Sequence, residues 1–195
     1  MLDEKHIKEL ERRVRNFIKD DTIKKSVDKK FVKFFLDNAE NSLDSAKLLF
    51  NVSTNDSIKN DLGFPDFNGF LWVINSSYYS MFYMARALLE KNGIKIKRDF
   101  SIHSITFDSL VYYFYLTGKL QKKLIEDLEE AREEASEILG NEKAKQLIED
   151  YFHEKRKRGR FTYEMGTIAM RNKAETSLKR AKLFNEEIRK IIELD

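Results

Sequence analysis

Hydrophobic residues along this chain recur at helical spacing. Apolar positions three or four residues apart predict helices over about residues 3–19, 28–51, 70–92, 120–138 and 163–193. The segment 70–92 is apolar on more than one face, a pattern typical of a helix at the centre of a bundle. In the last helix, the apolar stripe expected to be buried consists of Ile168, Ala174, Leu178, Ala181, Phe184, Ile188 and Ile191.

Turn-forming residues separate these segments. Residues 53–68 are rich in turn formers and contain the only proline, Pro65, so a loop is expected there. Asn92-Gly93 is a helix stop signal, and a basic loop is expected over residues 94–99. Gly140-Asn141 ends another helix, and a shorter helix is expected from there to about Lys157.

The segment 102–117 is ambiguous on propensity alone, because it is rich in aromatic and β-branched residues that favour strands. Its length and the near-helical spacing of its apolar residues favour a helix, and no other strand pattern is found. The sequence therefore predicts an all-α fold, an antiparallel up-and-down bundle of four to five core helices over residues 28–195. Residues 1–27 are expected to form an N-terminal helical extension.

Composition narrows the class of protein. Of the 195 residues, 42% are hydrophobic and 35% charged, which is too hydrophobic for a disordered chain and too charged for a membrane protein. The start, MLDEKHIKEL, lacks the apolar core of a secretory signal, so a cytoplasmic location is expected. There is no cysteine, and the three histidines are scattered, so neither a metal site nor a cofactor is expected.

The net charge is only +3, so any attraction to nucleic acid must come from local clustering of charge. The clearest basic segment is HEKRKRGRFTYEMG, residues 153–166, in which five of the six residues 155–160 are basic. Arginine presents a planar fork of donors to phosphate, and a neighbouring aromatic ring can stack on a base. The candidates for RNA or phosphate binding are Arg156, Arg158, Arg160 and Tyr163.

The same segment has a second interpretation without any ligand. Basic residues favour the C-terminal end of a helix, where they offset its dipole. They could also pair with the acidic residues of segment 126–137, whose carboxylates are expected to form a solvated face.

The central helix carries a second candidate group in NSSYYSMFYMAR, residues 75–86. Its aromatic residues are most simply explained by core or dimer packing, with each tyrosine hydroxyl needing a hydrogen-bond partner. A role in binding a ligand is the alternative. The residues concerned are Tyr78, Tyr79, Phe82 and Tyr83.

The order of three segments gives the chain a resemblance to a known family. YYSMFYMARALLEKNGI is followed by IHSITFDSLVYYFYLTGKL, and a charged helical pair then ends in RGRFTYE. This order resembles archaeal and bacterial members of the HEPN superfamily (higher eukaryotes and prokaryotes nucleotide-binding domain), which have a YYxMF helix and a His-Ser pair before the next helix. The resemblance covers about residues 30–192. It implies a four- or five-helix bundle that is usually dimeric.

Many members of that family are metal-independent endoribonucleases, and many are encoded beside a minimal nucleotidyltransferase as toxin and antitoxin. Their active site is an arginine followed, after four to six residues, by a histidine. The histidine activates the ribose 2′-hydroxyl, and the arginine stabilises the phosphate charge. Here no histidine follows Arg156, Arg158 or Arg160 at that spacing, and Tyr163 is a poor base at neutral pH.

One literal match to the spacing lies elsewhere in the chain, Arg98 followed by His103. It falls between the second and third core segments, and His103 is more simply a polar residue in the first turn of a helix. The candidate catalytic residues are therefore Arg158, Tyr163, Arg98 and His103.

Three functions follow from these observations. The first is a HEPN-like homodimer that binds RNA, a nucleotide or a nucleotidyltransferase partner, with ribonuclease activity lost or altered. The second is an active endoribonuclease toxin that uses Arg98 and His103 or an Arg-Tyr variant of the site. The third is a non-catalytic structural dimer.

Overall fold

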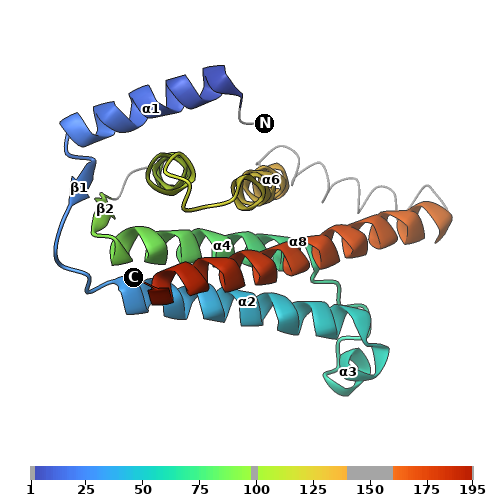
Figure 1. The fold of residues 1–195 in the computed structure, drawn as a ribbon. Helices are drawn as coiled ribbons and strands as arrows, with labels where there is room; N and C mark the ends of the chain where they lie inside the picture. Colours follow the sequence, from blue (N-terminus) through green and yellow to red (C-terminus); the bar gives the residue numbers. More distant parts are fainter. Residues whose placement is uncertain (1–2, 98–100, 140–159, 195) are drawn as a thin grey trace.

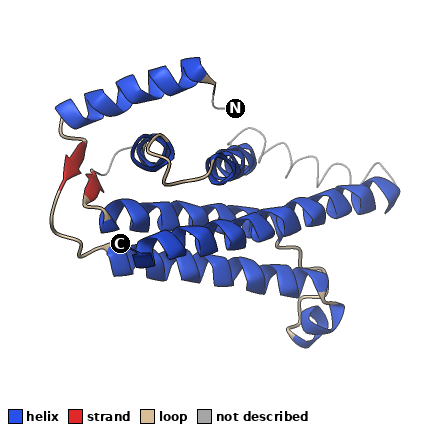
Figure 2. Ribbon diagram, in the orientation of Figure 1, coloured by secondary structure: helices blue, strands red, loops and turns tan. Residues whose placement is uncertain are grey.

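The computed structural model describes residues 3–97, 101–139 and 160–194 (Figure 1). The predicted all-α class is confirmed, because helices make up most of the described chain (Figure 2). In chain order the helices are α1 (Glu4–Lys19), α2 (Val32–Thr54), α3 (Asp56–Asp61), α4 (Phe70–Lys91), α5 (Ile102–Leu110), the π-helix η1 (Val111–Tyr115), α6 (Lys122–Leu139) and α8 (Arg160–Leu194). None of the helices in these ranges is long and apolar enough to cross a membrane.

Helix α4 lies at the centre of the bundle, as its pattern predicts. It packs most extensively on α2 and α8, and α6 and α5 contact it less. Figure 1 shows α2 running antiparallel to α4 and α8 running parallel to it, while α5 and α6 are seen end-on above this layer. The buried positions of α4 run from Phe70 to Glu90 and are mostly apolar, with Ser77, Ser80, Arg86 and Glu90 as the polar exceptions.

The apolar stripe predicted for the last helix is largely buried, with Phe184 and Ile188 wholly inaccessible. Ile168 is an exception, because 52% of it is exposed. The N-terminal turns of α8 extend beyond the N-terminal end of α4 (Figure 1). The apolar residues of these turns therefore do not lie alongside α4.

The structure corrects the prediction that no strand is present. Two short strands, β1 (Ile23–Lys25) and β2 (Ile94–Ile96), pair antiparallel with Ile23 opposite Ile96. Segment 94–96 was expected to lie in a loop. Strands of three residues are too short to show a period of two, so hydrophobic pattern cannot reveal them.

Gly93 makes the entry into β2 possible. Its φ of +70° lies in the left-handed region, and a Cβ atom there would lie 2.3 Å from the Ser26 carbonyl oxygen. The backbone N–H of Ser26 in turn donates to the Gly93 carbonyl at 2.8 Å. The paired strands β1 and β2 thereby connect the N-terminal helix α1 to the end of α4.

Two predicted segments differ in detail. The expected loop 53–68 contains the short helix α3, whose first turn is capped by the Asn55 side chain accepting from the Ile58 N–H at 3.2 Å. The expected helix 102–117 is present as α5, but it continues as the π-helix η1, where the Leu116 N–H donates to the Val111 carbonyl. The short helix expected to end near Lys157 lies outside the described residues.

Helix α1 is held by apolar packing and by an ion pair. Leu10 and Val14 are buried in the core cluster. The Arg13 guanidinium donates to both carboxylate oxygens of the buried Asp108 on α5, at 2.8 and 3.0 Å. This fork-to-carboxylate geometry is among the stronger hydrogen-bonding arrangements in proteins, so it fixes the orientation of α1 on the bundle.

The acidic face of α6 is not wholly solvated, contrary to the sequence-based expectation. Arg180 of α8 is buried, and its guanidinium lies 3.0 Å from both Glu130 and Glu134 and 3.7 Å from Asp127. The Ser177 hydroxyl donates to Glu134 at 3.0 Å. Arg180 therefore forms an ion-pair cluster with Asp127, Glu130 and Glu134, and this cluster joins α6 to α8.

Candidate functional site

Most of the basic residues predicted to form a site have side chains that the structure does not describe. Arg98, Arg156 and Arg158 lie outside the described residues. Arg160 and Tyr163 lie in the first turn of α8, and their side chains are likewise outside the description. The geometry of a site is therefore built from the remaining candidates, His103 and the aromatic residues of α4.

His103 lies in the first turn of α5 and faces the aromatic side of α4. Its ring centroid is 4.3 Å from that of Phe82 and 5.7 Å from that of Tyr79. The Tyr78 hydroxyl lies 2.7 Å from Nδ1 of His103. The structure thus brings together two candidate groups that the sequence placed 25 residues apart, and no sequence signal indicated that they meet.

The Tyr78–His103 hydrogen bond engages Nδ1 of the imidazole. Burial raises the pKa of Tyr78 well above its usual value, so its hydroxyl is neutral. The hydroxyl donates to Nδ1 in the tautomer that carries its proton on Nε2, and it accepts from the Nδ1–H in the other tautomer.

The pKa of His103 is itself lowered. Burial of the ring is the main cause, and the positive charges of Arg132 and Arg86 add to it. At neutral pH the imidazole is therefore uncharged, with Nδ1 engaged by the Tyr78 hydroxyl.

His103 is the end of a continuous run of rings that we name the aromatic band. It joins α2, α4 and α5 through contacts of 4.3 to 6.5 Å between ring centroids. Tyr78 and Phe82 are buried, whereas Phe31 and Phe34 are 45% and 52% exposed and the rest are half-buried. The members of the band are Phe31, Phe34, Phe35, Tyr78, Tyr79, Phe82, Tyr83 and His103.

Cations flank the α2 end of this band. Lys30 and Lys95 lie over the Phe31 ring at 5.2 and 5.6 Å, and the Arg86 guanidinium lies 4.9 Å from the centroid of Phe35. Burial lowers the pKa of Arg86 to about 10, which still leaves it charged at neutral pH. Exposed rings beside positive charges can stack on bases and attract phosphates.

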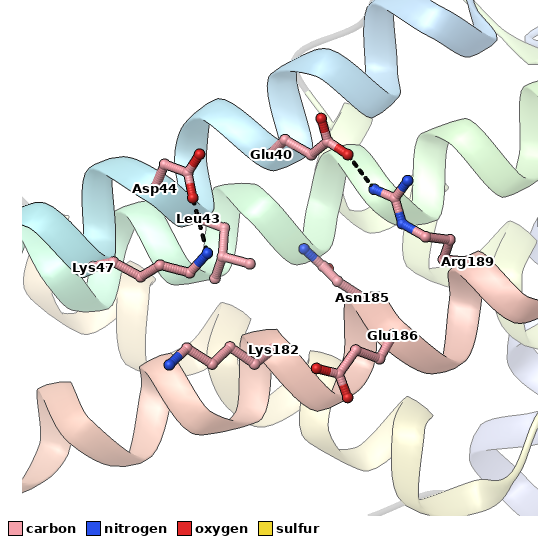
Figure 3. A pocket seen from close by; sticks show the side chains of 8 residues that line it. All are labelled: Glu40, Leu43, Asp44, Lys47, Lys182, Asn185, Glu186 and Arg189. Atoms are coloured by element: carbon pink, nitrogen blue, oxygen red, sulfur yellow. Dashed lines mark hydrogen bonds and ion pairs between the residues drawn. The ribbon is translucent and has the colours of Figure 1, made fainter.

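A groove lies on another part of the molecule. A groove of about 600 Å³ runs between α2 and α8, with Leu43 and Asn185 among its lining residues (Figure 3). Glu40 pairs with Arg189 across it, and Asp44 pairs with Lys47 on one wall. These charges compensate one another, and none of the lining residues belongs to the aromatic band. The groove is therefore a less suitable site for a polyanion.

The comparisons with known proteins add no relative. Comparison of the chain with protein-family models, with curated proteins and with solved structures finds no match. In the ranges that the structure describes, no group of three or more histidine, cysteine, aspartate or glutamate residues is arranged to hold a metal ion.

The lowered pKa of His103 predicts a dependence of stability on pH. Below the ordinary histidine pKa of about 6.5, the unfolded chain takes up a proton at this position. The folded chain does not until the lower folded pKa is reached, so the free energy of unfolding decreases as the pH falls through this window. Urea denaturation should show wild type losing more stability than His103→Gln as the pH falls below about 6.5, by at most about 1.4 kcal/mol per pH unit. Equal losses in the two proteins would contradict a lowered pKa of His103 in the folded chain.

Proposed function

We propose that this chain is a HEPN-like RNA-binding protein that holds single-stranded RNA on the aromatic band without cleaving it. The observation that carries the proposal is the aromatic band itself, a run of partly exposed rings with cations beside it. Single-stranded nucleic acid is bound by such platforms, because every base has a π-face and every linkage has a phosphate charge. Phe31 and Phe34 are 45% and 52% exposed, so part of each ring is open to a base.

The contact of His103 with Tyr78 supports binding in preference to cleavage. A general base must present an unprotonated nitrogen to the ribose 2′-hydroxyl. Nδ1 of His103 is already engaged by the Tyr78 hydroxyl at 2.7 Å. In the proposed complex the tautomer that carries its proton on Nε2 donates a hydrogen bond to a phosphate oxygen, which is a binding role.

The basic segment 155–160 extends this proposal beyond the described residues. Because α8 begins at Arg160, the segment leads directly into the longest helix of the bundle. In the proposed complex its arginines contact phosphates of the RNA, and the band stacks on the bases. Affinity should then fall with salt in proportion to the number of phosphates contacted.

Fluorescence anisotropy with a labelled single-stranded RNA tests this proposal. The double variant Arg158→Ala/Arg160→Ala should bind more weakly than wild type. Each lost phosphate contact should also reduce the slope of log affinity against log salt by about 0.7 for a single strand. Lys182→Gln removes a positive charge from the groove between α2 and α8 and should leave both quantities unchanged. Absence of RNA binding by wild type at low salt would refute the proposed function.

A further inference from the structure

Four residues of α4 that are not buried line one face of the helix. Trp72, Ser76, Tyr79 and Tyr83 follow one another at steps of four, three and four residues, which places them on the same face. Trp72 is 59% exposed, and the other three are half-buried. The positions of α4 that are not buried are Leu71, Trp72, Asn75, Ser76, Tyr79, Tyr83 and Lys91. We name the face formed by Trp72, Ser76, Tyr79 and Tyr83 the α4 stripe.

The α4 stripe continues the aromatic band toward the start of α4. Tyr79 and Tyr83 belong to both, with 6.1 Å between their ring centroids. At the other side of Tyr83 the band passes to α2, where the ring of Phe35 stacks on that of Tyr83 at 6.5 Å. Trp72 lies about two turns of helix before Tyr79. It therefore adds a ring to the open face at the end farthest from α2 residue Phe35.

The spacing of the α4 stripe suits a single strand. Ser76 is the stripe residue between Trp72 and Tyr79, and its small side chain leaves the space between the two rings open to a base. At a rise of 1.5 Å per residue, Trp72 and Tyr83 are about 16 Å apart along the helix axis. At about 3.4 Å per stacked nucleotide, that length accommodates about five nucleotides.

The α4 stripe also runs in the direction that the proposed complex requires. Figure 1 shows the N-terminal turns of α8 extending beyond the N-terminal end of α4, the end at which Trp72 lies. Helix α8 begins at Arg160. A strand that follows the stripe from Tyr83 to Trp72 therefore approaches the end of the bundle at which the basic segment 155–160 enters α8.

We propose that single-stranded RNA follows the α4 stripe and that Trp72 is a further stacking platform for one of its bases. Indole offers the largest aromatic face of any side chain, and every base can stack on it. This inference rests on the proposed function. It extends the binding site to a residue outside the aromatic band and gives the path of the RNA, along α4 toward the start of α8.

Trp72 itself supplies the measurement, because it is the only tryptophan of the chain. Saturating wild type with an eight-nucleotide oligouridylate should quench the tryptophan emission, and the quenching curve should give the same dissociation constant as fluorescence anisotropy of the labelled strand. Trp72→Leu should bind the labelled strand about 5-fold or more weakly than wild type, the lower end of the range for one stacked base. Trp72→Phe keeps an aromatic face and should recover most of the loss.

Phe64→Leu is the matched control, because Phe64 is 65% exposed and precedes α4 instead of lying on the stripe. It should bind the strand as wild type does, and an equal loss in this variant would overturn the inference. Circular dichroism checks that each variant is folded, which is expected because both rings are exposed.

The outcomes separate the two proposals. If wild type binds no RNA at low salt, the proposed function fails and this inference fails with it. If wild type binds but its tryptophan emission is unchanged, or if Trp72→Leu binds as tightly as wild type, only the inference is overturned. Trp72→Leu that changes the molar mass by light scattering and leaves RNA affinity unchanged would show that Trp72 contacts a second copy of the chain, which also overturns it.

Discussion

Replacement of Arg180 by methionine is expected to lower the free energy of unfolding by about 3–5 kcal/mol, the range for breaking a buried ion pair by removal of one partner. Arg180 is buried between α6 and α8 and faces three carboxylates. Without it, the partners that remain among the described residues are Lys123 for the buried Asp127, at 2.8 Å, and the Ser177 hydroxyl for Glu134. Urea denaturation at neutral pH measures the loss.

A neighbouring residue provides the control for that variant. Lys179 forms an exposed ion pair with Glu175 on the same helix, and Lys179→Met should change stability by less than about 0.5 kcal/mol. Adding Asp127→Asn and Glu134→Gln to Arg180→Met should recover part of the loss, because those changes remove the uncompensated charges. A loss below about 1 kcal/mol in Arg180→Met would show that the cluster is effectively solvated.

The largest functional effect is expected from the two half-buried tyrosines of the aromatic band. Alanine substitution of a stacking residue costs about 1–3 kcal/mol per base, so losing both rings should weaken RNA binding by roughly 30-fold or more. Tyr79→Leu/Tyr83→Leu removes the aromatic faces while keeping most of the apolar volume that packs against Phe35 and Phe82. Fluorescence anisotropy at constant salt gives the ratio of dissociation constants.

Tyr112→Leu/Tyr113→Leu is the matched control, because these half-buried tyrosines of η1 also contact each other but lie outside the band. It should bind RNA as wild type does. Light scattering on the same samples separates RNA binding from self-association. If Tyr79→Leu/Tyr83→Leu alters the oligomeric state and leaves RNA affinity unchanged, the band is a surface for a second copy, and the proposed function is wrong.

Helical periodicity was sufficient to predict the long elements of the fold. The stripe of α4 predicted Val73, Met81 and Leu88 as core, and all three are fully buried. Periodicity fails where an element is too short to repeat, as in β1, β2 and α3. It also fails at Ile168. Burial of an apolar residue at that position depends on where the neighbouring helix α4 begins, which the spacing within α8 does not reveal.

The site was only partly predictable, for a different reason. Tyr78, Tyr79, Phe82, Tyr83 and His103 were predicted from the sequence as separate candidates, and their contact depends on how α5 crosses α4. Phe34 and Arg132 were not selected, because an exposed ring on one helix and an arginine on another have no spacing in common.

Photocrosslinking of RNA containing 4-thiouridine, followed by mass spectrometry of the crosslinked peptides, tests the central claim most directly. Bases that stack on the aromatic band should crosslink to Phe34, Tyr79 and Tyr83, and excess unlabelled RNA should suppress these crosslinks. Crosslinks confined to the groove residues Lys47, Lys182 and Arg189, or spread evenly over exposed lysines, would contradict the claim.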